Sequence, residues 1–443
     1  MGFKTYDKYK NSYNVWAGNI PEHWQIHKIK NLIFFQEGPG LRNWQFTDDG
    51  IRVICVTNIT SKGIDFTNYE KFISEEEYKQ TYSHFTVNKG DLLLSSSGNS
   101  WGKVAEYKDD DTVILNTSTI RINKNPSSDY ELIQPYIKWA LQSEYIREQL
   151  GLMMTGSCQP NFGPTHLAKV SVLMPTLDEQ KQIANYLDKK TAKIDETIAK
   201  NEELIQLLEE KRVALINQVV TKGLDPNVVM KDSGVEWIGE IPEHWKVEKI
   251  KKYFYIHNGS TPKDNDDNWG GDICWITPAD YKTTDIYINK SSRRITKKGL
   301  NSCGTTLVPK GSIIVSNRAP IGTVAIANVD LCTNQGCKSL SIKRNINTKF
   351  VYYSLSINEN ELNKLGRGTT FMELSSYDLG TFQIPIAPDS EQIGIIEYLD
   401  KETLKIDQTL SKIKENINLL EEYKTSLIHH VVTGKIDVRG EEI

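Results

Sequence analysis

The chain has 443 residues, of which 38% are hydrophobic and 25% charged, and its formal net charge is −4. This composition is that of an ordinary globular protein with two or more domains, and the small negative charge argues against a protein that coats nucleic acid without sequence preference. The six cysteines form no CxxC pair, and no apolar run is long enough for a signal peptide or a membrane span, so we expect a cytosolic protein with reduced thiols rather than a zinc site or a disulfide framework.

The first element in chain order is a short lead-in segment that occurs twice. Residues 10–24 read KNSYNVWAGNIPEHW and residues 231–245 read KDSGVEWIGEIPEHW, an offset of 221 residues (245 − 24). The proline of IPEHW favours an extended chain, and the tryptophan is suited to packing on the domain that follows. We therefore interpret His23 and His244 as packing or capping residues and not as catalytic residues.

A variable domain with mixed strand and helix signals follows each lead-in. In the first copy, residues 51–56 and 91–95 are typical of strands and residues 130–150 of a helix. The strand-like segments of the second copy are residues 273–277, 312–316 and 337–342. A strand is expected to run into a proline before each long helix, at Pro175 and at Pro385.

The two variable domains share a few anchor residues although most of their sequence has diverged. KGDLL at residues 89–93 matches KGSII at residues 310–314, and Asn116 falls near the position of Asn334. Repetition at a period above 200 residues indicates a duplicated domain pair and not a solenoid. The sequence therefore predicts one scaffold that carries two different sets of loops.

Each variable domain is followed by a segment that is expected to form one long helix. Residues 178–225 and 390–437 share EQ, YLD, KID, LLEE and VVT at an offset of 212 residues (391 − 179). Neither segment contains a proline, and Gly394 is the one interior glycine before the closing turns. Roughly 40 helical residues would span about 60 Å.

The apolar residues of both segments recur at alternating steps of four and three, which is typical of a coiled-coil seam. An ordinary surface helix would show a wider and less regular apolar stripe. The obvious partner of each helix is the other one, and Asn201 in the stripe either fixes the register or lies hydrated. The predicted seam residues are Leu187, Ile194, Ile198, Ile205, Leu208, Leu215, Leu399, Ile406, Leu410, Ile417, Leu420 and Leu427.

The sequence contains no convincing catalytic or metal-binding motif. It has no Pro-Pro dipeptide, which the [Asn/Asp]-Pro-Pro-aromatic motif of DNA methyltransferases requires, and GNSWGKV at residues 98–104 is one residue too short for a P-loop. The acidic run at residues 264–267 has no following carboxylate and lysine pair, so a solvated loop is expected there. HExxH and EF-hand patterns are absent, and His429-His430 at a helix end is a poor metal site.

The loops of both variable domains do carry the side chains with which proteins read DNA. Arginine and lysine suit guanine, asparagine and glutamine suit adenine, and hydroxyl groups suit phosphates. Each cluster taken singly resembles an ordinary polar turn, but their occurrence on two copies of one scaffold favours two DNA-reading surfaces. The candidate DNA-binding residues are Arg42, Asn43, Ser97, Asn99, Ser157, Gln159 and Asn161 in the first domain, and Lys263, Arg293, Arg294, Asn317, Arg318, Asn334, Gln335, Arg367, Thr369 and Thr370 in the second.

Over essentially its whole length, the chain resembles the specificity (S) subunit of type I restriction-modification systems. The resemblance rests on the two IPEHW motifs, on Pro-x-x-x-x-Glu-Gln from Pro175 ahead of YLD and KID, and on QPNF after Gly156-Ser157. The second copy departs from this pattern through an additional Pro388 and through FMEL in place of QPNF.

The resemblance implies an α+β protein with target-recognition domains at residues 1–176 and 226–388, in a pseudo-twofold arrangement. Helices at residues 177–225 and 389–443 would form an antiparallel coiled coil. Each domain would read one half of a bipartite target in double-stranded DNA, and the helices would set the spacer. The chain itself would bind no cofactor, because two modification subunits would methylate adenine with S-adenosylmethionine and restriction subunits would cut with ATP and Mg.

Two alternatives belong to other functional classes. One is a self-contained DNA-modifying enzyme, which the absence of motor, nuclease and methyltransferase segments disfavours. The other is a structural coiled-coil adaptor without DNA specificity, which would not need two sets of polar loops. A sequence-specific shift of DNA mobility discriminates the adaptor from the specificity subunit.

Overall fold

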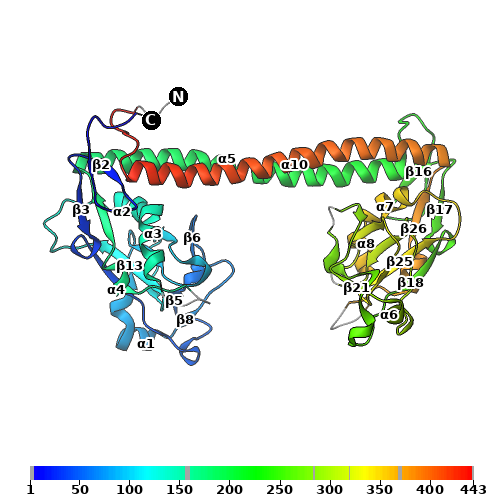
Figure 1. Ribbon diagram of the computed structural model, residues 1–443, viewed down its shortest axis with the longest axis horizontal. Coiled ribbons are helices and arrows are strands. Elements are labelled where there is room, and N and C mark those ends of the chain that lie inside the picture. Colours follow the sequence, from blue (N-terminus) through cyan, green and yellow to red (C-terminus); the bar gives the residue numbers. More distant parts are fainter. Residues whose placement is uncertain (1–3, 155–159, 283–284, 319, 368–371, 442–443) are drawn as a thin grey trace. The chain divides into compact units, whose positions relative to one another are not determined.

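The computed structural model describes residues 4–154, 160–282, 285–318, 320–367 and 372–441. It divides the chain into two compact units, unit 1 (Met1–Asn201 and Glu415–Ile443) and unit 2 (Glu202–Lys414). Each unit combines one sheet-rich domain with a part of each long helix (Figure 1). The ends of the long helices pack into the cores of the domains, so each compact unit includes a part of both helices.

Unit 1 contains two four-stranded sheets, with strand orders β11-β10-β13-β4 and β8-β5-β12-β9, together with the pairs β1–β2, β3–β14 and β6–β7. Its strands are β1 (Tyr9–Asn11), β2 (Asn19–Pro21), β3 (Gln25–Lys28), β4 (Ile33–Glu37), β5 (Ile51–Ile54), β6 (Ile59–Thr60), β7 (Gly63–Ile64), β8 (Phe72–Ile73), β9 (Thr86–Val87), β10 (Leu92–Ser95), β11 (Val104–Glu106), β12 (Val113–Leu115), β13 (Thr119–Lys124) and β14 (Ser171–Met174). Its short helices are α1 (Glu75–Glu77), α2 (Gln134–Gln142), α3 (Glu144–Met153) and α4 (Pro164–Leu167). The predicted helix at residues 130–150 is thus two helices, because Ser143 between them adopts an extended conformation.

Unit 2 repeats this architecture with a five-stranded sheet of order β18-β25-β22-β23-β20 and a three-stranded sheet of order β21-β19-β24, together with the pairs β15–β16 and β17–β26. Its strands are β15 (Met230–Asp232), β16 (Glu240–Pro242), β17 (Lys246–Lys249), β18 (Phe254–Asn258), β19 (Trp269–Ile276), β20 (Tyr287–Ile288), β21 (Arg293–Ile295), β22 (Ile313–Ser316), β23 (Val324–Ala327), β24 (Leu331–Thr333), β25 (Cys337–Ile342) and β26 (Gln383–Ile386). Its short helices are α6 (Lys297–Asn301), α7 (Thr348–Ser356), α8 (Glu359–Lys364) and α9 (Ser376–Thr381). Pro175 follows β14 as predicted, but Pro385 lies inside β26 opposite Val247, in a two-stranded sheet that tolerates its missing N–H.

The central strands of the two units pair in the same register. In unit 1, Leu92 of β10 faces Ile122 of β13, and in unit 2, Ile313 of β22 faces Leu340 of β25. All four side chains are buried. The expectation of one scaffold carrying two sets of loops is therefore confirmed at the level of strand pairing.

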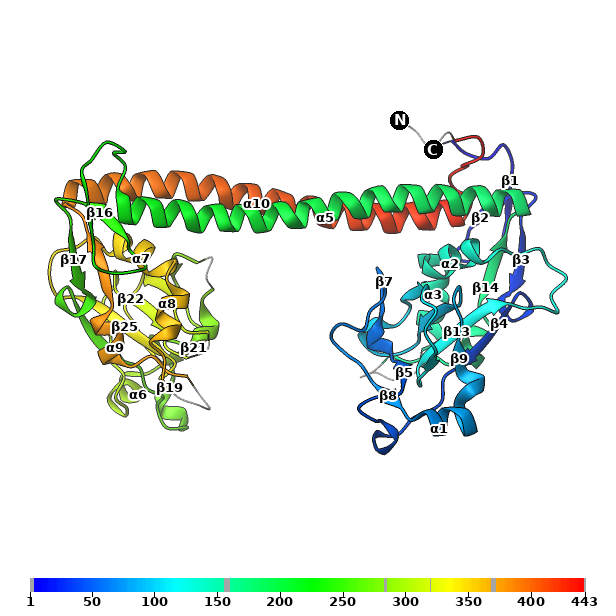
Figure 2. The same ribbon diagram turned by 180° about the vertical axis from the view of Figure 1, so that it is seen from behind.

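The long helices α5 (Leu177–Lys222) and α10 (Asp389–Val432) pack against each other (Figures 1 and 2). They end earlier than the predicted segments 177–225 and 389–443, because Gly223 and Gly434 follow with positive φ angles of 75° and 70°, a conformation that ends helices. Leu187 and Leu399 of the predicted seam are fully buried. Ile194, Ile198, Ile406, Leu410 and Leu427 are buried nearly as well, and Ile205, Leu208, Leu215, Ile417 and Leu420 are half-buried.

Two ion pairs mark the seam, and they are repeats of each other. Within unit 1, the Lys424 ammonium lies 2.6 Å from the Asp195 carboxylate, and within unit 2, the Arg212 guanidinium lies 3.6 Å from that of Asp407. Asp407 is the repeat equivalent of Asp195 (407 − 195 = 212), and Lys424 that of Arg212. The basic residues that interrupt the apolar seam are thus each matched by an acid on the facing helix.

None of the helices in the described part of the chain is long and apolar enough to cross a membrane.

The turn between β1 and β2 holds Tyr13 in a conformation that suits glycine. Tyr13 has a φ of 54° and is 94% exposed, and its repeat equivalent Gly234 has a φ of 69°. Replacing Tyr13 by glycine should therefore raise the free energy of unfolding of unit 1 by about 1 kcal/mol, because the left-handed conformation costs a residue with a Cβ about that much. Hydrogen exchange in the hairpin measures this change. The converse substitution Gly234→Tyr should lower stability in unit 2, and an unchanged hairpin in both variants would contradict the argument.

Candidate nucleic-acid interface

Three neighbouring strands of each unit end at one edge of the sheet, and the loops there carry most of the candidate DNA-binding residues. In unit 1, the end of β4, the start of β13 and the end of β10 lie side by side, with Ser95 facing Thr119. In unit 2, β18, β25 and β22 meet in the same way, with Ser316 facing Cys337. We call this edge the polar edge of each unit.

A glycine at the polar edge allows two of these loops to touch. A Cβ atom on Gly38 would lie 2.2 Å from the backbone oxygen of Asn116, and one on Gly259 would lie 1.8 Å from that of Asn334. Both distances are too short for any side chain. Asn116 and Asn334, which the sequence had marked as matching anchors, thus occupy the same place in the two units.

A further loop, which precedes α4 or α9, pairs with the loop that follows β10 or β22. The amide of Phe162 donates to Ser96 O at 3.1 Å, and the amide of Leu374 donates to Asn317 O at 2.9 Å. Phe162 and Leu374 are both buried. Residues 372–374 therefore occupy the position of residues 160–162, and Glu373 corresponds to Asn161.

The structure brings some of the candidates in unit 1 together. Ser97 pairs with Asn161 through a backbone bridge, and Asn99 is exposed in the adjoining turn. Arg42 and Asn43 are exposed after β4, next to Trp44, which is 79% exposed and which the sequence analysis did not single out. Ser157 and Gln159 lie outside the described residues.

The corresponding candidates in unit 2 surround an acidic residue that the sequence analysis missed. The side-chain amide of Asn317 donates to the Glu373 carboxylate at 3.0 Å, and the Arg318 guanidinium lies 3.1 Å from the same group. Lys338 lies 3.8 Å from it, and although burial lowers the pKa of Lys338, Glu373 opposes this change. Glu373 could have been identified from its place in the repeat, because it directly precedes Leu374 as the candidate Asn161 directly precedes Phe162.

Arg367 and the loop of Asn334 complete this edge of unit 2. Arg367 forms an ion pair with Asp378 at 3.0 Å, and Thr369 and Thr370 lie outside the described residues. The side-chain oxygen of Asn334 accepts from the amide of Gly336, whereas exposed Gln335 accepts from the Thr261 hydroxyl at 2.5 Å. Part of the candidate set therefore holds the loops in shape.

The candidate residue Arg293 contacts this edge of unit 2 through aromatic side chains. The Arg293 guanidinium lies 3.6 Å from the ring centre of Trp269 and 5.7 Å from that of Trp275, and the indole of Trp275 donates to Ser260 O at 3.0 Å. Arg294 and Lys263 are exposed, and they remain candidates for contacting phosphates.

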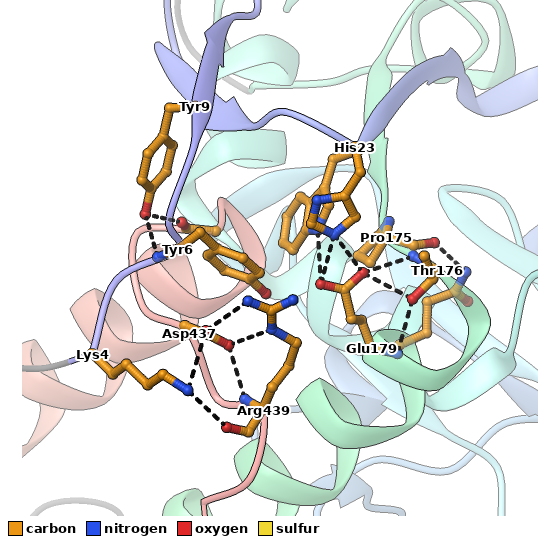
Figure 3. Close-up of polar contacts among 12 residues, drawn as sticks. Lys4, Tyr6, Tyr9, His23, Pro175, Thr176, Glu179, Asp437 and Arg439 are labelled. Carbon is orange, nitrogen blue, oxygen red and sulfur yellow. Dashed lines mark hydrogen bonds and ion pairs between the residues drawn. The ribbon is translucent and has the colours of Figure 1, made fainter.

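The IPEHW and Glu-Gln motifs, far apart in the sequence, meet at the first turn of each long helix. In unit 1, the Glu179 carboxylate accepts hydrogen bonds from Trp24 Nε1 at 3.3 Å and from the Thr176 hydroxyl at 2.8 Å, and it lies 2.9 Å from His23 Nε2 (Figure 3). Burial alone would raise the pKa of Glu179, but the hydrogen bonds from these partners outweigh it and lower the pKa.

The same arrangement recurs in unit 2. Glu391 accepts from Trp245 Nε1 at 2.9 Å and lies 2.7 Å from His244 Nε2. The glutamines of both motifs fix the preceding chain, since Gln180 Oε1 accepts from the amide of Ile133 and Gln392 Oε1 from that of Asn347. This geometry gives both histidines a structural role at the helix start.

No group of three or more His, Cys, Asp or Glu side chains in the described part of the chain is placed to hold a metal ion. His429 is half-buried and its neighbour His430 is exposed.

Two sheet-rich domains with repeated polar edges and a pair of long helices define a duplicated recognition scaffold, and comparison with known families agrees. Residues 21–208 and 242–419 match the family described as "Type I restriction modification DNA specificity domain". The chain belongs to this family.

Individual relatives carry the same description. A protein of Methanocaldococcus jannaschii described as a candidate specificity subunit of the type I restriction enzyme MjaX is 28% identical over 443 residues, which cover 98% of each chain. The MjaIX specificity subunit of the same organism is 36% identical over 194 residues, 43% of this chain and 44% of that protein.

Solved structures show the same fold. One chain, from a study of complex assembly and conformational transition of the type I restriction-modification system, superimposes with a TM-score of 0.72 at 18% identity, covering 93% of this chain and 98% of that one. The HsdS subunit from Thermoanaerobacter tengcongensis gives a TM-score of 0.51 at 18% identity, covering 94% and 98%.

Proposed function

We propose that this protein is the non-catalytic specificity subunit of a cytoplasmic type I restriction-modification complex, in which each unit reads one half of a bipartite target in double-stranded DNA. The observation that supports this most directly is the repeated polar edge. Both units hold the same loops in the same register, and the side chains on those loops differ, with Ser97 and Asn161 in unit 1 replaced by Arg318 and Glu373 in unit 2. Different donors and acceptors on one scaffold are what two different half-sites require.

The chemistry of such a complex belongs to its partners. We propose that two modification subunits supply S-adenosylmethionine-dependent methylation of adenine and that restriction subunits supply ATP- and Mg-dependent cleavage, while this chain binds no cofactor. Several apolar side chains outside the seam of the long helices support the docking of partners, because exposed apolar groups on one element mark interaction surfaces. These are Leu204, Leu207, Val213, Leu404, Leu419 and Tyr423.

Co-expression with a modification subunit, followed by single-molecule methylation mapping of host DNA, tests this function. We expect methyladenine on both strands of one interrupted motif with two defined halves. If a stable complex forms and no new methylation appears, DNA specificity would be refuted, and the adaptor function would replace it.

Lengthening both long helices should change the spacer and leave both half-sites intact. Insertion of one heptad after Glu203 and another after Glu415, which are repeat equivalents, preserves the seam and adds about 10 Å of helix, or about three base pairs. Methylation mapping of the variant reads the spacer directly. A spacer that stays the same in a methylating variant would show that the helices do not set it.

A further inference from the structure

A cavity in unit 2 differs from the equivalent site in unit 1 in the side chains that fill it, although several of the residues around the two sites are repeated. It has a volume of about 330 Å³, and it lies at the start of α10. Its walls include Asp225, Pro242, His244, Glu391 and Gly394. We call it the unit 2 pocket.

In unit 1, the side chain of Tyr6 fills the equivalent space. Its ring centre lies 5.9 Å from that of His23 and 5.7 Å from that of Trp24, and the Arg439 guanidinium covers it at 4.5 Å (Figure 3). Tyr6 is only 5% exposed. Burial, together with the nearby Glu179 and Asp437 carboxylates, raises the pKa of Tyr6 well above its ordinary value, so its phenol stays neutral.

The groups that surround Tyr6 are the repeat equivalents of the pocket walls. His23 corresponds to His244 at the lead-in offset of 221, and Glu179 and Asp437 correspond to Glu391 and Asp225 at the helix offset of 212. Unit 2 has Asn227 where unit 1 has Tyr6, and Asn227 is exposed. The pocket therefore lacks the aromatic side chain that its walls accommodate elsewhere in the same protein.

The two sites also differ in how the equivalent carboxylates, Asp437 and Asp225, are paired with cations. The Asp437 carboxylate is 2.9 Å from Arg439 and 3.6 Å from Lys4. In the described part of the chain, Asp225 has no ion-pair partner, and its carboxylate accepts only from the amide of Asn227, at 2.9 Å. The unit 2 pocket thus offers an aromatic-sized space next to the Asp225 carboxylate, which forms no ion pair in the described part of the chain, and Lys222 is the cationic residue on its wall.

The apolar side chains on the walls of the pocket are those of Leu224, Val228, Pro242 and Ile395. Leu224 is 46% exposed, whereas its equivalent Ile436 in unit 1 is 5% exposed. In unit 1, the hollow that remains outside Tyr6 is lined by charged residues, among them Asp7, Lys8 and Glu22. An exposed apolar side chain beside a concave site is typical of a surface that another protein covers.

We propose that the unit 2 pocket receives an aromatic side chain, with an adjacent arginine or lysine, from the modification subunit, as Tyr6 and Arg439 fill unit 1 from within the chain. This inference rests on the proposed function, which supplies the partner. It makes the two units unequal, because only unit 2 needs an external residue. The aromatic ring packs between Pro242 and His244, and the neighbouring cation pairs with Asp225.

Gly394 offers a way to block the pocket without disturbing the fold. A Cβ atom at this position would meet only the Leu224 side chain, at 3.9 Å, so Gly394→Phe can fill the space from its wall. Gly394→Ala is the matched control, because it gives the same kind of gain in helix propensity and leaves the pocket open. Asp225→Lys, at an exposed position, reverses the charge beside the pocket without placing an aromatic ring in it.

The first measurement uses 4-fluorophenol as a stand-in for the aromatic side chain and ¹⁹F NMR of the full chain. We expect saturable binding to the wild type and to Gly394→Ala, and none to Gly394→Phe. Binding that survives Gly394→Phe, or that is absent from the wild type, would overturn the assignment of the pocket.

The second measurement titrates the modification subunit and counts bound copies by native mass spectrometry. We expect two copies on the wild type and on Gly394→Ala, with the second copy bound about thirtyfold more weakly by Gly394→Phe and Asp225→Lys, the effect of losing a hot-spot residue. Unchanged binding of both copies by these variants would overturn the pocket inference and leave the proposed function standing. Failure of the wild type to bind any modification subunit would overturn the proposed function as well.

Discussion

Replacement of Tyr6 by alanine should lower the free energy of unfolding of unit 1 by about 3 kcal/mol, as for other large aromatic side chains removed from a core. Tyr6 is buried against Trp24, and Arg439 stacks on its outer face. The substitution leaves a cavity and also frees the chain end that contains Asp437, whose amide donates to Lys4 O at 2.8 Å. Hydrogen exchange of peptides from residues 4–24 and 427–440 reads this loss locally.

The repeat supplies the control for this prediction. Asn227→Ala changes the equivalent position in unit 2, where the side chain is exposed, and it should leave exchange there within about 0.5 kcal/mol of the wild type. Added p-cresol should restore protection to Tyr6→Ala, because it replaces the missing ring. If the two substitutions lowered the protection from hydrogen exchange equally, the Tyr6 side chain would contribute no more to its site than the exposed Asn227 side chain does.

The elements that local pattern determines were predictable from the sequence. The heptad spacing predicted α5 and α10 and their pairing, because apolar residues at steps of four and three can be buried only along one side of a helix. The helix ends at Lys222 and Val432 were not predictable in this way, because the backbone conformation at Gly223 and Gly434, and not the hydrophobic period, decides where the helices end. In the same way, the extended conformation of Ser143 divided one predicted helix into two.

The contacts through which the motifs stabilise the fold were not predictable, because they join residues far apart in the chain. Glu179 meets Trp24 across more than 150 residues, and nothing in either motif identifies the other as its partner. Glu373 was missed because an acidic side chain is unexpected in a DNA-reading loop, and its role with Asn317 and Arg318 depends on the pairing of two loops. Which candidates touch DNA stays a prediction.

Sequence repetition also conceals the main difference between the units. The lead-in repeats at an offset of 221 and the helix at an offset of 212. By the first offset Tyr6 is the repeat equivalent of Asn227, and by the second offset Arg439 is the repeat equivalent of the same Asn227. This correspondence becomes apparent only in the folded protein, where the lead-in and the helix end form one site. In unit 1, Tyr6 and Arg439 come from two separate segments and together fill the site beside His23, whereas in unit 2 the continuous segment 225–230 has neither an aromatic ring nor an arginine. The asymmetry is therefore a property of the folded protein and not of either repeat alone.

Replacement of Glu179 by glutamine should destabilise unit 1 by about 2 kcal/mol at neutral pH, because hydrogen bonds to a buried charged group contribute about that much. The carboxylate of Glu179 is nearly buried and accepts from Trp24 and Thr176. Its pKa is lowered from the ordinary value of 4.5, so its contribution is fully present above that pH and is lost as the pH falls through the lower folded-state pKa. The difference between the wild type and Glu179→Gln should therefore shrink below about pH 4.5.

Glu391→Gln is the matched control in unit 2. The carboxylate there is 39% exposed, so water can hydrogen-bond to the groups that lose the carboxylate as a partner. Its effect at neutral pH should be smaller, since solvent screens an exposed pair. Denaturation of both variants followed by hydrogen exchange between pH 3 and pH 7 separates the two sites, and the comparison of each variant with the wild type cancels the titration of all other carboxyl groups. A difference for Glu179→Gln that stays constant down to pH 3 would mean that the ionised carboxylate is not what holds Trp24 and the first turn of α5 together.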